Sequence, residues 1–374
     1  MVVFIRSNDI VSDPRAMKYI NFMAREGVPC RRIAWDRYEK ASEEANTVYY
    51  HKKAGFNVGG VKAAFNKARW MIFVVKSLKK MNLSDDVLHG CDLDSAFPAV
   101  VYRMLYNRDV KIVFDVFDWY TATLHDQNIL FRLVFRIMER ITVQQSDYII
   151  ICEPERIKQI PYRLKKAKLS VLPNIPYFDS DFIMEEDSEY KFDNDLITLS
   201  YVGGFAPERC LEEIIDIAEE GLVNLNIAGY GLPCIEERIR NLKGRPNIKY
   251  YGKVKYEEGL SIMYNSDVIY AMYATTNPNH VFAAPNKFYE AMMLGKPLFT
   301  TKGTIVERKV MEMGIGYVAG ESKEEIVNVI KQLSKNDMLL KGEESHRIWE
   351  SKYKTYTDEY MKNVYSQIIK RQSI

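Results

Sequence analysis

The chain has 374 residues, which is long enough for two domains of ordinary size. Hydrophobic residues make up 47% of it and charged residues 27%, as in folded rather than disordered proteins. A net charge of +2 argues against a dedicated nucleic-acid binder, and five scattered cysteines without a Cys-x-x-Cys pair argue against structural zinc or a disulfide framework. No signal peptide or spanning segment is visible, so we expect a cytoplasmic protein.

Two buried strands are predicted near the start of the chain, at residues 2–5 and 32–35. The helix between them should begin with Asp13 as N-cap and Pro14 in the first turn, and should end at Gly27. No Gly-x-Gly-x-x-Gly sequence separates the two strands. A dinucleotide-dependent oxidoreductase is therefore disfavoured.

A basic helix is predicted at residues 61–81. One face of it should hold Val61, Phe65, Ala68, Ile72 and Val75. Further apolar residues spill beyond this face, and lysines and arginines flank it. The pattern suits the headgroup layer of an anionic membrane, and it equally suits a core helix whose apolar excess packs under a neighbouring loop.

A strand, loop and helix follow, with Asp92 and Asp94 in the loop. Two aspartates at this spacing can hold a divalent ion against a diphosphate, but Asp94 followed by Ser95 is also typical of a helix cap. The strand expected at 111–116 is followed by Asp118 and Tyr120, near the strand end where ligands of parallel sheets bind. A helix from Glu139 and a strand at 148–152 complete this half of the chain.

The pattern restarts after an acidic segment, 179–195, which is the candidate linker. A strand at 196–202 should end in a close turn at Gly203 and Gly204, with a helix from Glu208. Strands are also expected at 224–228 and 248–251.

The most informative stretch is 267–303, which predicts a strand at 268–273, a polar loop, a helix at 287–294 and a strand at 298–300. Asn286 stands where an N-cap belongs, and Gly295 ends the helix. The amides of such a helix start can bind phosphate, and Glu290 could accept hydrogen bonds from a ribose diol. Alternatively, Glu290 only complements the helix dipole.

The segment PNKFYEAMMLGKP resembles the P-s-K-x-x-E-A-m-a-x-G-k-P segment of family 4 of the retaining glycosyltransferases. The resemblance implies that Glu290 holds the ribose of a nucleotide sugar, with Asn286 and Lys287 beside the sugar and diphosphate. The family's first motif Glu would fall at Phe282, which has no carboxylate, so donor-sugar recognition should be organised differently.

Two further segments support the resemblance. GGFAPERCL is similar to the family's G-R-L-x-P-E-K-G-L, with Gly204 in place of the Arg and Arg209 in place of the Lys. Arg209 would then bind the diphosphate, and Lys287 could supply a second charge. The family's His-Glu pair corresponds to Phe117 and Asp118, which leaves Asp118 to meet the acceptor. By the same resemblance Val254 and Tyr256 are candidates for nucleobase contact, although both could equally be cap and core residues.

The predicted fold is α/β, of the GT-B class, with two doubly wound Rossmann-like domains facing across a cleft. The expected divisions are an acceptor domain at 1–178, the linker at 179–195, a nucleotide-sugar domain at 196–352 and a helix at 353–374 returning to the first domain. The catalytic candidates are Asp118, Arg209 and Lys287. The donor-binding candidates are Gly203, Gly204, Arg209, Tyr256, Asn286, Lys287 and Glu290.

The implied reaction moves a sugar from a UDP- or GDP-sugar to a hydroxyl of a glycan or lipid-linked acceptor, without a metal or other cofactor. The basic helix 61–81 suggests peripheral contact with the inner face of the cell membrane. Two alternatives remain open at this stage. They are a nucleotide-sugar epimerase on the same fold and a non-catalytic binding subunit.

Overall fold

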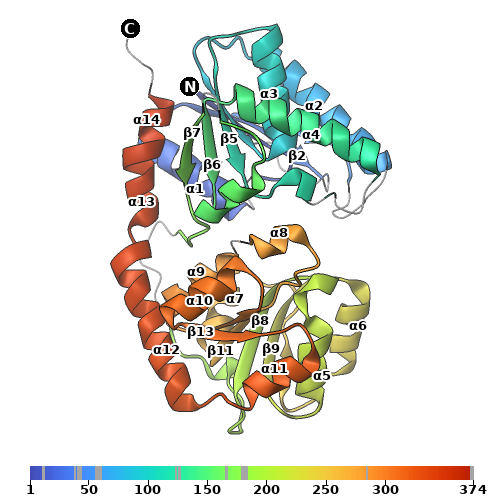
Figure 1. Ribbon diagram of the computed structural model, residues 1–374, viewed down its shortest axis with the longest axis vertical. Helices are drawn as coiled ribbons and strands as arrows, with labels where there is room; N and C mark the ends of the chain where they lie inside the picture. Colours follow the sequence, from blue (N-terminus) through green and yellow to red (C-terminus); the bar gives the residue numbers. More distant parts are fainter. Residues whose placement is uncertain are drawn as a thin grey trace. The chain divides into compact units, whose positions relative to one another are not determined.

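The computed structural model describes residues 1–10, 13–37, 39, 44–54, 61–122, 124, 128–164, 167–177, 184–283 and 285–370, apart from the side chains of 61–63. Contacts divide the chain into two units (Figure 1). The first comprises Met1–Pro173 and Thr357–Ile374, and the second comprises Asn174–Tyr356. The second unit is thus inserted between two parts of the first.

The first unit contains a seven-stranded parallel sheet in the order β3-β2-β1-β4-β5-β6-β7. The order of the strands reverses between β1 and β4, and this is where ligands bind in doubly wound sheets. The strands are β1 (Val2–Arg6), β2 (Cys30–Asp36), β3 (Thr47–His51), β4 (Val87–Cys91), β5 (Lys111–Val116), β6 (Tyr148–Ile151) and β7 (Lys168–Val171).

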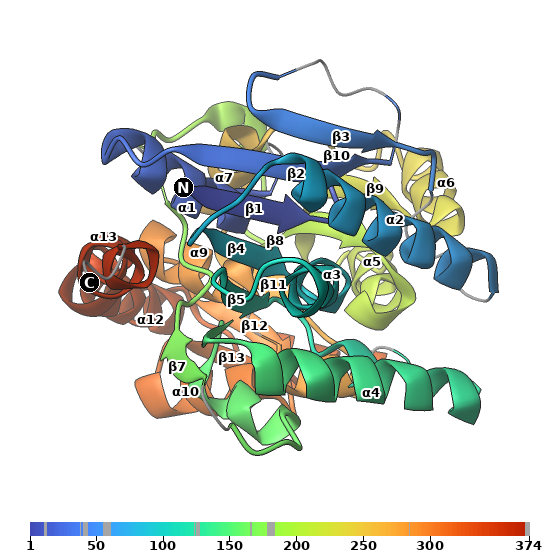
Figure 2. The ribbon, with the colours of Figure 1, turned by 90° about the horizontal axis from the view of Figure 1, so that it is seen from above.

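Helices cover both faces of this sheet. The helices are α1 (Pro14–Arg25), α2 (Val61–Lys80), α3 (Leu93–Leu105), α4 (Ile129–Gln145), the 3-10 turns η1 (Tyr120–Ala122) and η2 (Pro154–Gln159), α13 (Tyr356–Tyr360), the π-helical turn η6 (Met361–Tyr365) and α14 (Ser366–Ile369). Figure 2 shows α2, α3 and α4 side by side. Val3 and Ile5 pack toward α2 and α3, whereas Phe4 between them packs on Tyr19 of α1. This alternation is the period of two expected of a strand.

The start of α1 follows the sequence prediction. Asp13 is the N-cap, and its carboxylate accepts hydrogen bonds from the backbone amides of Arg15 and Ala16. Pro14 occupies the first turn, and Gly27 follows the helix with a φ of 64°. Both ends of α1 are therefore set by local sequence.

The predicted length of α2 is nearly right, and its buried face differs from the apolar face that the sequence singled out. Trp70, Val74 and Leu78 form its buried face, and Trp70 stacks on Trp35 of β2 with ring centroids 5.7 Å apart. Phe65 and Ile72, which belong to the face that the sequence singled out, are more than half exposed. Part of the apolar excess of α2 packs on Trp35 of β2 and Tyr50 of β3, rather than under a loop as the core interpretation held. The membrane contact of α2 stays a prediction.

The predicted start of α4 at Glu139 is wrong, because the helix begins at Ile129. Asn128 caps it by accepting a hydrogen bond from the amide of Leu130 at 2.9 Å. Asp92, rather than Asp94, occupies the N-cap position of α3. It makes no capping bond there, and its φ of 64° is unusual for a residue with a side chain.

The second unit contains a six-stranded parallel sheet in the order β10-β9-β8-β11-β12-β13. Its strands are β8 (Thr198–Phe205), β9 (Asn224–Gly231), β10 (Ile248–Tyr250), β11 (Val268–Ala271), β12 (Leu298–Thr301) and β13 (Gly316–Ala319). Its helices are η3 (Ser188–Tyr190), η4 (Pro207–Arg209), α5 (Leu211–Glu219), α6 (Pro233–Asn241), α7 (Tyr256–Tyr264), α8 (Pro278–Val281), α9 (Asn286–Leu294), α10 (Ile305–Met313), α11 (Lys323–Ile330), α12 (Lys335–Ile348) and the π-helical turn η5 (Trp349–Tyr353). The order of the strands reverses between β8 and β11.

The end of β8 differs from the prediction of a turn at Gly203 and Gly204. Both glycines continue the strand, where Gly203 pairs with Gly229 and Gly204 with Tyr230 of β9. A Cβ at Gly229 would lie 1.8 Å from the carbonyl oxygen of Gly203, and the φ of Gly229 is 143°. Glycine at 229 therefore permits this close approach of two backbones. The helix expected from Glu208 begins only at Leu211.

The second unit begins at Asn174, and part of the predicted linker, 179–183, lies outside the described residues. The predicted linker and domain bounds stay predictions. Thr357 onward belongs to the first unit, where Tyr365 donates to or accepts from Nδ1 of His89 at 2.9 Å. Within the described part of the chain, no helix is both long and apolar enough to cross a membrane.

Candidate functional site

The candidate site of the second unit lies at the carboxyl ends of β8 and β11, where the strand order reverses. The chain leaves β8 through η4, and the amide of Ala274, just after β11, donates a 2.9 Å hydrogen bond to the carbonyl of Glu208. This bond ties the two loops together. Residues 203–209 and 273–274 are thereby held at one edge of the sheet, which is the position of ligands in doubly wound folds.

Arg209 is the cation of this edge. Its guanidinium carbon lies 4.3 Å from the ring centroid of Tyr273, so the side chain is held over an aromatic face. Its Nη1 is buried and has no hydrogen-bond partner among the described residues. An unpartnered buried guanidinium nitrogen is costly, and it is ready to donate to an anion.

Gly203 and Gly204 lie near the end of β8, which leads through η4 to Arg209. The hydroxyl of Tyr201 donates a 2.6 Å hydrogen bond to the carbonyl of Gly204, which fixes the strand end. A Cβ at Gly204 would meet nothing within 4 Å, so the position that corresponds to the family's Arg is open space. Burial raises the pKa of the Tyr201 phenol and outweighs the nearby Arg209, which lowers it. The phenol therefore stays protonated and can donate.

The start of α9 departs from the prediction in one respect. Pro285 occupies the N-cap position and Asn286 is the first helical residue, exposed and without a capping role. Pro285 preorganises the turn, but its side chain accepts no hydrogen bond from the first amides. The amides at the start of α9 remain able to bind an anion. Gly295 ends the helix in the left-handed conformation, as predicted.

Glu290 is fully buried on α9 and is held from two sides. Tyr256, at the start of α7, donates to Oε1 at 3.0 Å, and Lys287 donates to Oε2 at 2.6 Å. Burial raises the pKa of Tyr256, and the neighbouring Glu290 raises it further, so the phenol stays protonated. Each carboxylate oxygen still has a lone pair to offer to a ligand hydroxyl. The orientation of Glu290 is thus fixed before any ligand arrives.

Tyr273 connects the two halves of this site. Burial raises its pKa, Arg209 lowers it and Glu290 raises it, which places the phenol within electrostatic range of both charges. The structure therefore brings together Arg209, Tyr256, Lys287 and Glu290 at one sheet edge. Sequence reasoning missed Tyr273, whose only signal was its place at the end of the predicted strand 268–273.

The two remaining candidates of this unit lie differently. Val254 packs against the cluster of Tyr190, Ala228 and Ile262, which is the core interpretation. Phe282 is the C-cap of the short helix α8, and its side chain is half-buried.

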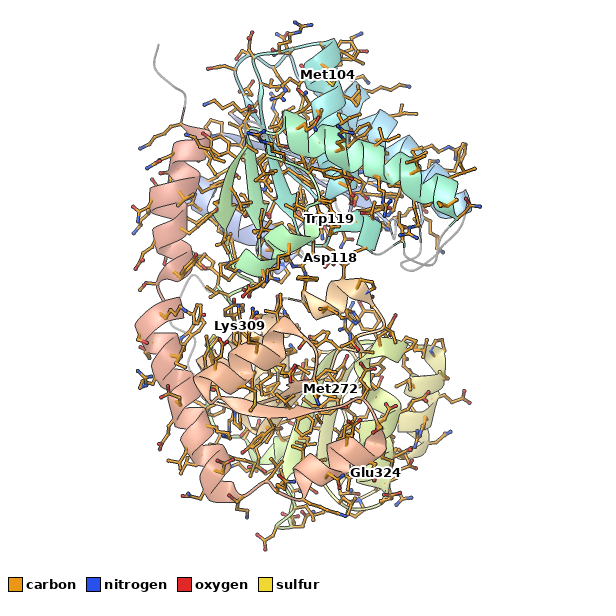
Figure 3. All side chains as sticks on the ribbon, viewed as in Figure 1. Met104, Asp118, Trp119, Met272, Lys309 and Glu324 are labelled. Atoms are coloured by element: carbon orange, nitrogen blue, oxygen red, sulfur yellow. The ribbon has the colours of Figure 1, made fainter. Side chains whose placement is uncertain are left out.

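Asp118 belongs to the first unit, at the loop after β5 (Figure 3). Its carboxylate is 61% exposed and lies 3.2 Å from Nη2 of the buried Arg156. The backbone amides of Phe117 and Asp118 donate to Oδ1 of Asp92, at 3.0 and 3.3 Å. Asp92 therefore positions the loop that carries Asp118.

A buried charged network at the β1 and β4 ends was not predicted. Arg15 binds Asp115 through Nη2 at 2.7 Å and the carbonyl of Leu172 through Nη1 at 2.6 Å. Burial alone would favour the neutral acid, but the Arg15 guanidinium outweighs it and holds the pKa of Asp115 well below its usual range. Lys18 lies nearby, and burial lowers its pKa to about 7. Arg6 pairs with Asp13 and Asp92.

Neither set of possible metal ligands in this unit fits a cation. His89, Cys91 and Asp115 offer ligand atoms within 4.8 Å of one another. However, Arg15 contacts both oxygens of Asp115, and burial raises the pKa of the Cys91 thiol well above its ordinary value. Asp92 is likewise occupied by Arg6 and two amides.

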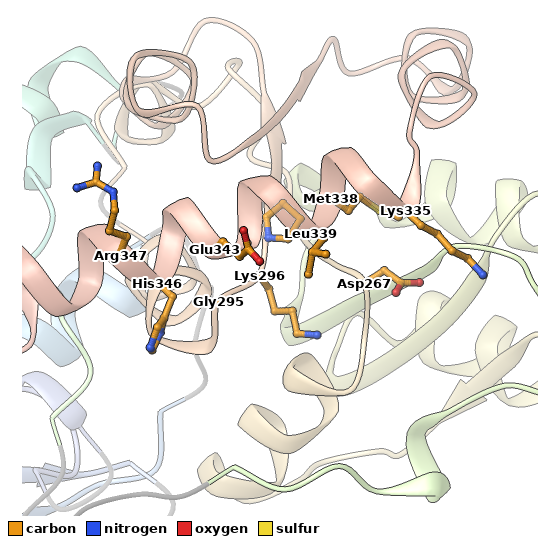
Figure 4. A pocket seen from close by; sticks show the side chains of 11 residues that line it. Asp267, Gly295, Lys296, Lys335, Met338, Leu339, Glu343, His346 and Arg347 are labelled. Carbon is orange, nitrogen blue, oxygen red and sulfur yellow. The ribbon is translucent and has the colours of Figure 1, made fainter.

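A cavity of about 620 Å³ in the second unit lies at the opposite edge of the sheet (Figure 4). Asp267 and Lys296, which line it, precede β11 and β12 in the chain. It is therefore at the amino ends of the strands, away from Arg209 and Glu290.

Comparison with known proteins gives one family model and a set of similar folds. The family model described as "Glycosyl transferases group 1" matches residues 183–355. No curated protein matches the chain by sequence.

Solved structures of similar fold include a sucrose-phosphate synthase from Thermosynechococcus elongatus, with a TM-score of 0.69 and 12% identity over 98% of both chains. HepE from Anabaena, in complex with UDP and glucose, has a TM-score of 0.67 and 12% identity over 98% of this chain and 99% of its own. WaaG, a glycosyltransferase involved in lipopolysaccharide biosynthesis, has a TM-score of 0.63 and 14% identity over 99% of both chains. The predicted α/β fold with two Rossmann-like halves is confirmed. Residues 183–355 thus match the group 1 glycosyltransferase model, and the chain has the fold of these GT-B glycosyltransferase structures.

Proposed function

We propose that the chain transfers a sugar from a nucleoside-diphosphate sugar to a hydroxyl of a glycan or lipid-linked acceptor, with retention of configuration. The observation that carries the proposal is the buried, unpartnered Nη1 of Arg209, placed at the same sheet edge as the preoriented Glu290. A diphosphate would satisfy the first group, and a ribose diol would satisfy the second.

The proposed donor roles follow from this arrangement. Arg209, Lys287 and the first amides of α9 bind the diphosphate, including Asn286 through its backbone. Glu290 accepts from the ribose, and Tyr256 supports Glu290. Gly203 and Gly204 leave room for the phosphates to approach β8. Charge stabilisation of the departing diphosphate would lower the barrier, and this chemistry requires no metal.

The proposed acceptor role falls to Asp118. Its exposed carboxylate is fixed by Arg156 and by the loop that Asp92 holds. We infer that the acceptor belongs to a polysaccharide or glycoconjugate pathway and is presented at the inner face of the cell membrane. The apolar Phe282, where the family has its first Glu, leaves the donor sugar to be recognised by other groups.

Thermal unfolding with UDP, GDP and ADP tests the donor site first, because HepE is described with UDP. A nucleotide at one hundred times its dissociation constant should add about 2.7 kcal/mol of stability. The shift should be lost in Glu290→Gln and reduced in Arg209→Met. The matched control is Glu212→Gln, an exposed change on α5.

Turnover tests the reaction itself. Release of the nucleoside diphosphate should require an acceptor, and the anomeric configuration of the product, read by NMR, should match that of the donor. Conversion of the nucleotide sugar without release of nucleotide would instead identify an epimerase. Absence of any nucleotide-dependent shift would contradict the proposal and favour a binding subunit.

A further inference from the structure

The outer face of α4 exposes an unusual amount of apolar surface. Five aliphatic side chains on its first nine residues are between 51% and 78% exposed: Ile129, Leu130, Leu133, Val134 and Ile137. Residues three or four positions apart share one side of a helix, so these five form one stripe, called here the α4 stripe. Single exposed aliphatic residues are ordinary, but a contiguous stripe marks an interaction surface.

The α4 stripe is not a consequence of a poorly packed helix. On the opposite side Phe135, Thr142 and Val143 are buried. The ring of Phe135 lies 4.9 Å from that of Tyr120, centroid to centroid, and Glu139 accepts hydrogen bonds from the amide and hydroxyl of Thr121. These contacts anchor the inner side of α4, and among the described residues the stripe keeps more than half of each side chain exposed.

The charged side chains that α4 itself exposes are basic. Arg132, Arg136 and Arg140 lie on α4, and Glu139, its sole carboxylate, is buried. On the other side of α3, α2 carries further basic residues and no acidic one: Lys67, Arg69, Lys76, Lys79 and Lys80. Lys67 lies over the ring of Tyr120, which in turn contacts Phe135 of α4. This contact reaches the inner side of α4, and α3 lies between α2 and α4 (Figure 2).

We propose that the α4 stripe inserts into the boundary between headgroups and acyl chains of an anionic lipid bilayer, with the arginines of α4 in the headgroup layer. The inference rests on the proposed function, because a lipid-linked acceptor is presented at such a surface. Aliphatic side chains bordered by arginines, without an exposed carboxylate, are the composition that suits this environment.

A second copy of the chain is a poorer occupant of the same face. A twofold interface places the same patch on both sides, so arginines would face arginines without a carboxylate of α4 to pair them. An anionic lipid supplies negative charge for Arg136 and Arg140, and the acyl chains cover the aliphatic residues.

Co-sedimentation of the full chain with vesicles tests this inference. The wild type should bind vesicles of phosphatidylglycerol and phosphatidylcholine more tightly than vesicles of phosphatidylcholine alone. Leu133→Gln with Ile137→Gln should lower the affinity roughly tenfold or more, because two aliphatic side chains no longer enter the lipid. Both positions are exposed, so the unfolding temperature should not change.

The matched control is Phe65→Gln with Ile72→Gln on α2, where both side chains are similarly exposed. It should change vesicle affinity less than about twofold, which separates α4 from the helix that the sequence favoured. Arg136→Gln with Arg140→Gln should weaken binding to the anionic vesicles about tenfold and flatten its salt dependence.

The results that overturn the inference are distinct from failure of the proposed function. Absence of wild-type binding, or equal binding by the α4 variant, would overturn it. Concentration-dependent dimers in light scattering that vanish in the α4 variant would assign the face to a second copy. The nucleotide-dependent thermal shift is measured without vesicles, so it reports on the donor site whatever the vesicles show.

Discussion

At the point where its strand order reverses, the first unit pairs Arg6 and Arg15 with aspartates, whereas the second unit leaves Arg209 with a nitrogen that has no partner among the described residues. All three are cations near the carboxyl ends of parallel strands, where ligands commonly bind. In the first unit internal carboxylates already neutralise the charges. A cation at the carboxyl ends of the strands is therefore a candidate for ligand binding only if it keeps a hydrogen-bond donor without a partner.

The paired cations of the first unit have a structural role. Arg15 joins Asp115 to the carbonyl of Leu172, and Asp115 lies 3.6 Å from Nε2 of His89, whose Nδ1 contacts the hydroxyl of Tyr365. The network thus connects both segments by which the chain passes between its two units. We expect its loss to change stability first and ligand affinity only afterwards.

The largest effect is expected for Asp115→Ala. The buried Arg15 then loses its carboxylate partner and keeps the carbonyl of Leu172. A broken buried ion pair costs about 3–5 kcal/mol, so the midpoint of urea unfolding should fall strongly. The double change Arg15→Met with Asp115→Ala should recover at least half of the loss. If the double variant is less stable than Asp115→Ala, the network is not held by charge pairing.

A smaller effect is expected for Glu139→Gln, and it should depend on pH. Burial raises the pKa of Glu139 to about 7, above its ordinary value of 4.5, so the folded state keeps a proton that the unfolded state releases. The stability that this group contributes is complete below pH 4.5 and is lost as pH rises through 7. The glutamine variant should therefore gain up to roughly 3 kcal/mol over the wild type across this window.

Urea unfolding at several pH values between 4 and 8 measures this difference. Glu212→Gln on the exposed surface of α5 serves as the control and should follow the wild type. A constant difference between Glu139→Gln and the wild type would show that the carboxyl group does not titrate in this range.

The opposite behaviour is expected for Arg209→Met. Its Nη1 has no partner to lose among the described residues, so unfolding of the ligand-free protein should change by less than about 1 kcal/mol. The affinity for a nucleoside diphosphate should fall by about 2 kcal/mol, roughly 30-fold, because a charge-assisted hydrogen bond is lost. Calorimetric titration checks this. Strong destabilisation without loss of nucleotide affinity would show that Arg209, like Arg15, stabilises the fold and does not bind the ligand.

The smallest effect is expected for Tyr256→Phe, which removes one hydrogen bond to Glu290. Stability and nucleotide affinity should each fall by about 1 kcal/mol, because Glu290 keeps Lys287 but loses one of its two fixed donors. Tyr264→Phe at the other end of α7 is the control for removal of a phenol hydroxyl. Equal effects of the two changes would show that Tyr256 has no special part in orienting Glu290.

Local signals predicted the strands and several helix ends. Asp13, Pro14 and Gly295 act where the sequence placed them, because a cap depends on residues close in the chain. Asn286 was assigned the cap that Pro285 occupies, an error of one position. Gly203 and Gly204 were expected to turn, but the strand continues because β9 has its own glycine, Gly229, at the place where the backbones meet.

The features that the sequence did not predict depend on distant pairing. Arg15 and Asp115 are 100 positions apart, and no local pattern connects them. The two apolar sides of α2 could not be ranked without knowing that Trp35 would stack on Trp70. For the donor site, the resemblance singled out Arg209, Lys287 and Glu290, and the structure places them at one sheet edge. The free nitrogen of Arg209 and the contact with Tyr273 needed the structure.

The insertion of one unit within the other has a consequence for the order of folding during synthesis. Asn174–Tyr356 is continuous, so it can complete its core as soon as it leaves the ribosome, whereas Tyr365 reaches His89 and Tyr19 only later. Until then the amino-terminal part of the first unit lacks the Tyr365 ring, which packs against Tyr19 and His89 in the complete protein. The nascent chain should therefore depend on chaperones for its amino-terminal half rather than for the part made afterwards, an inversion of the usual order.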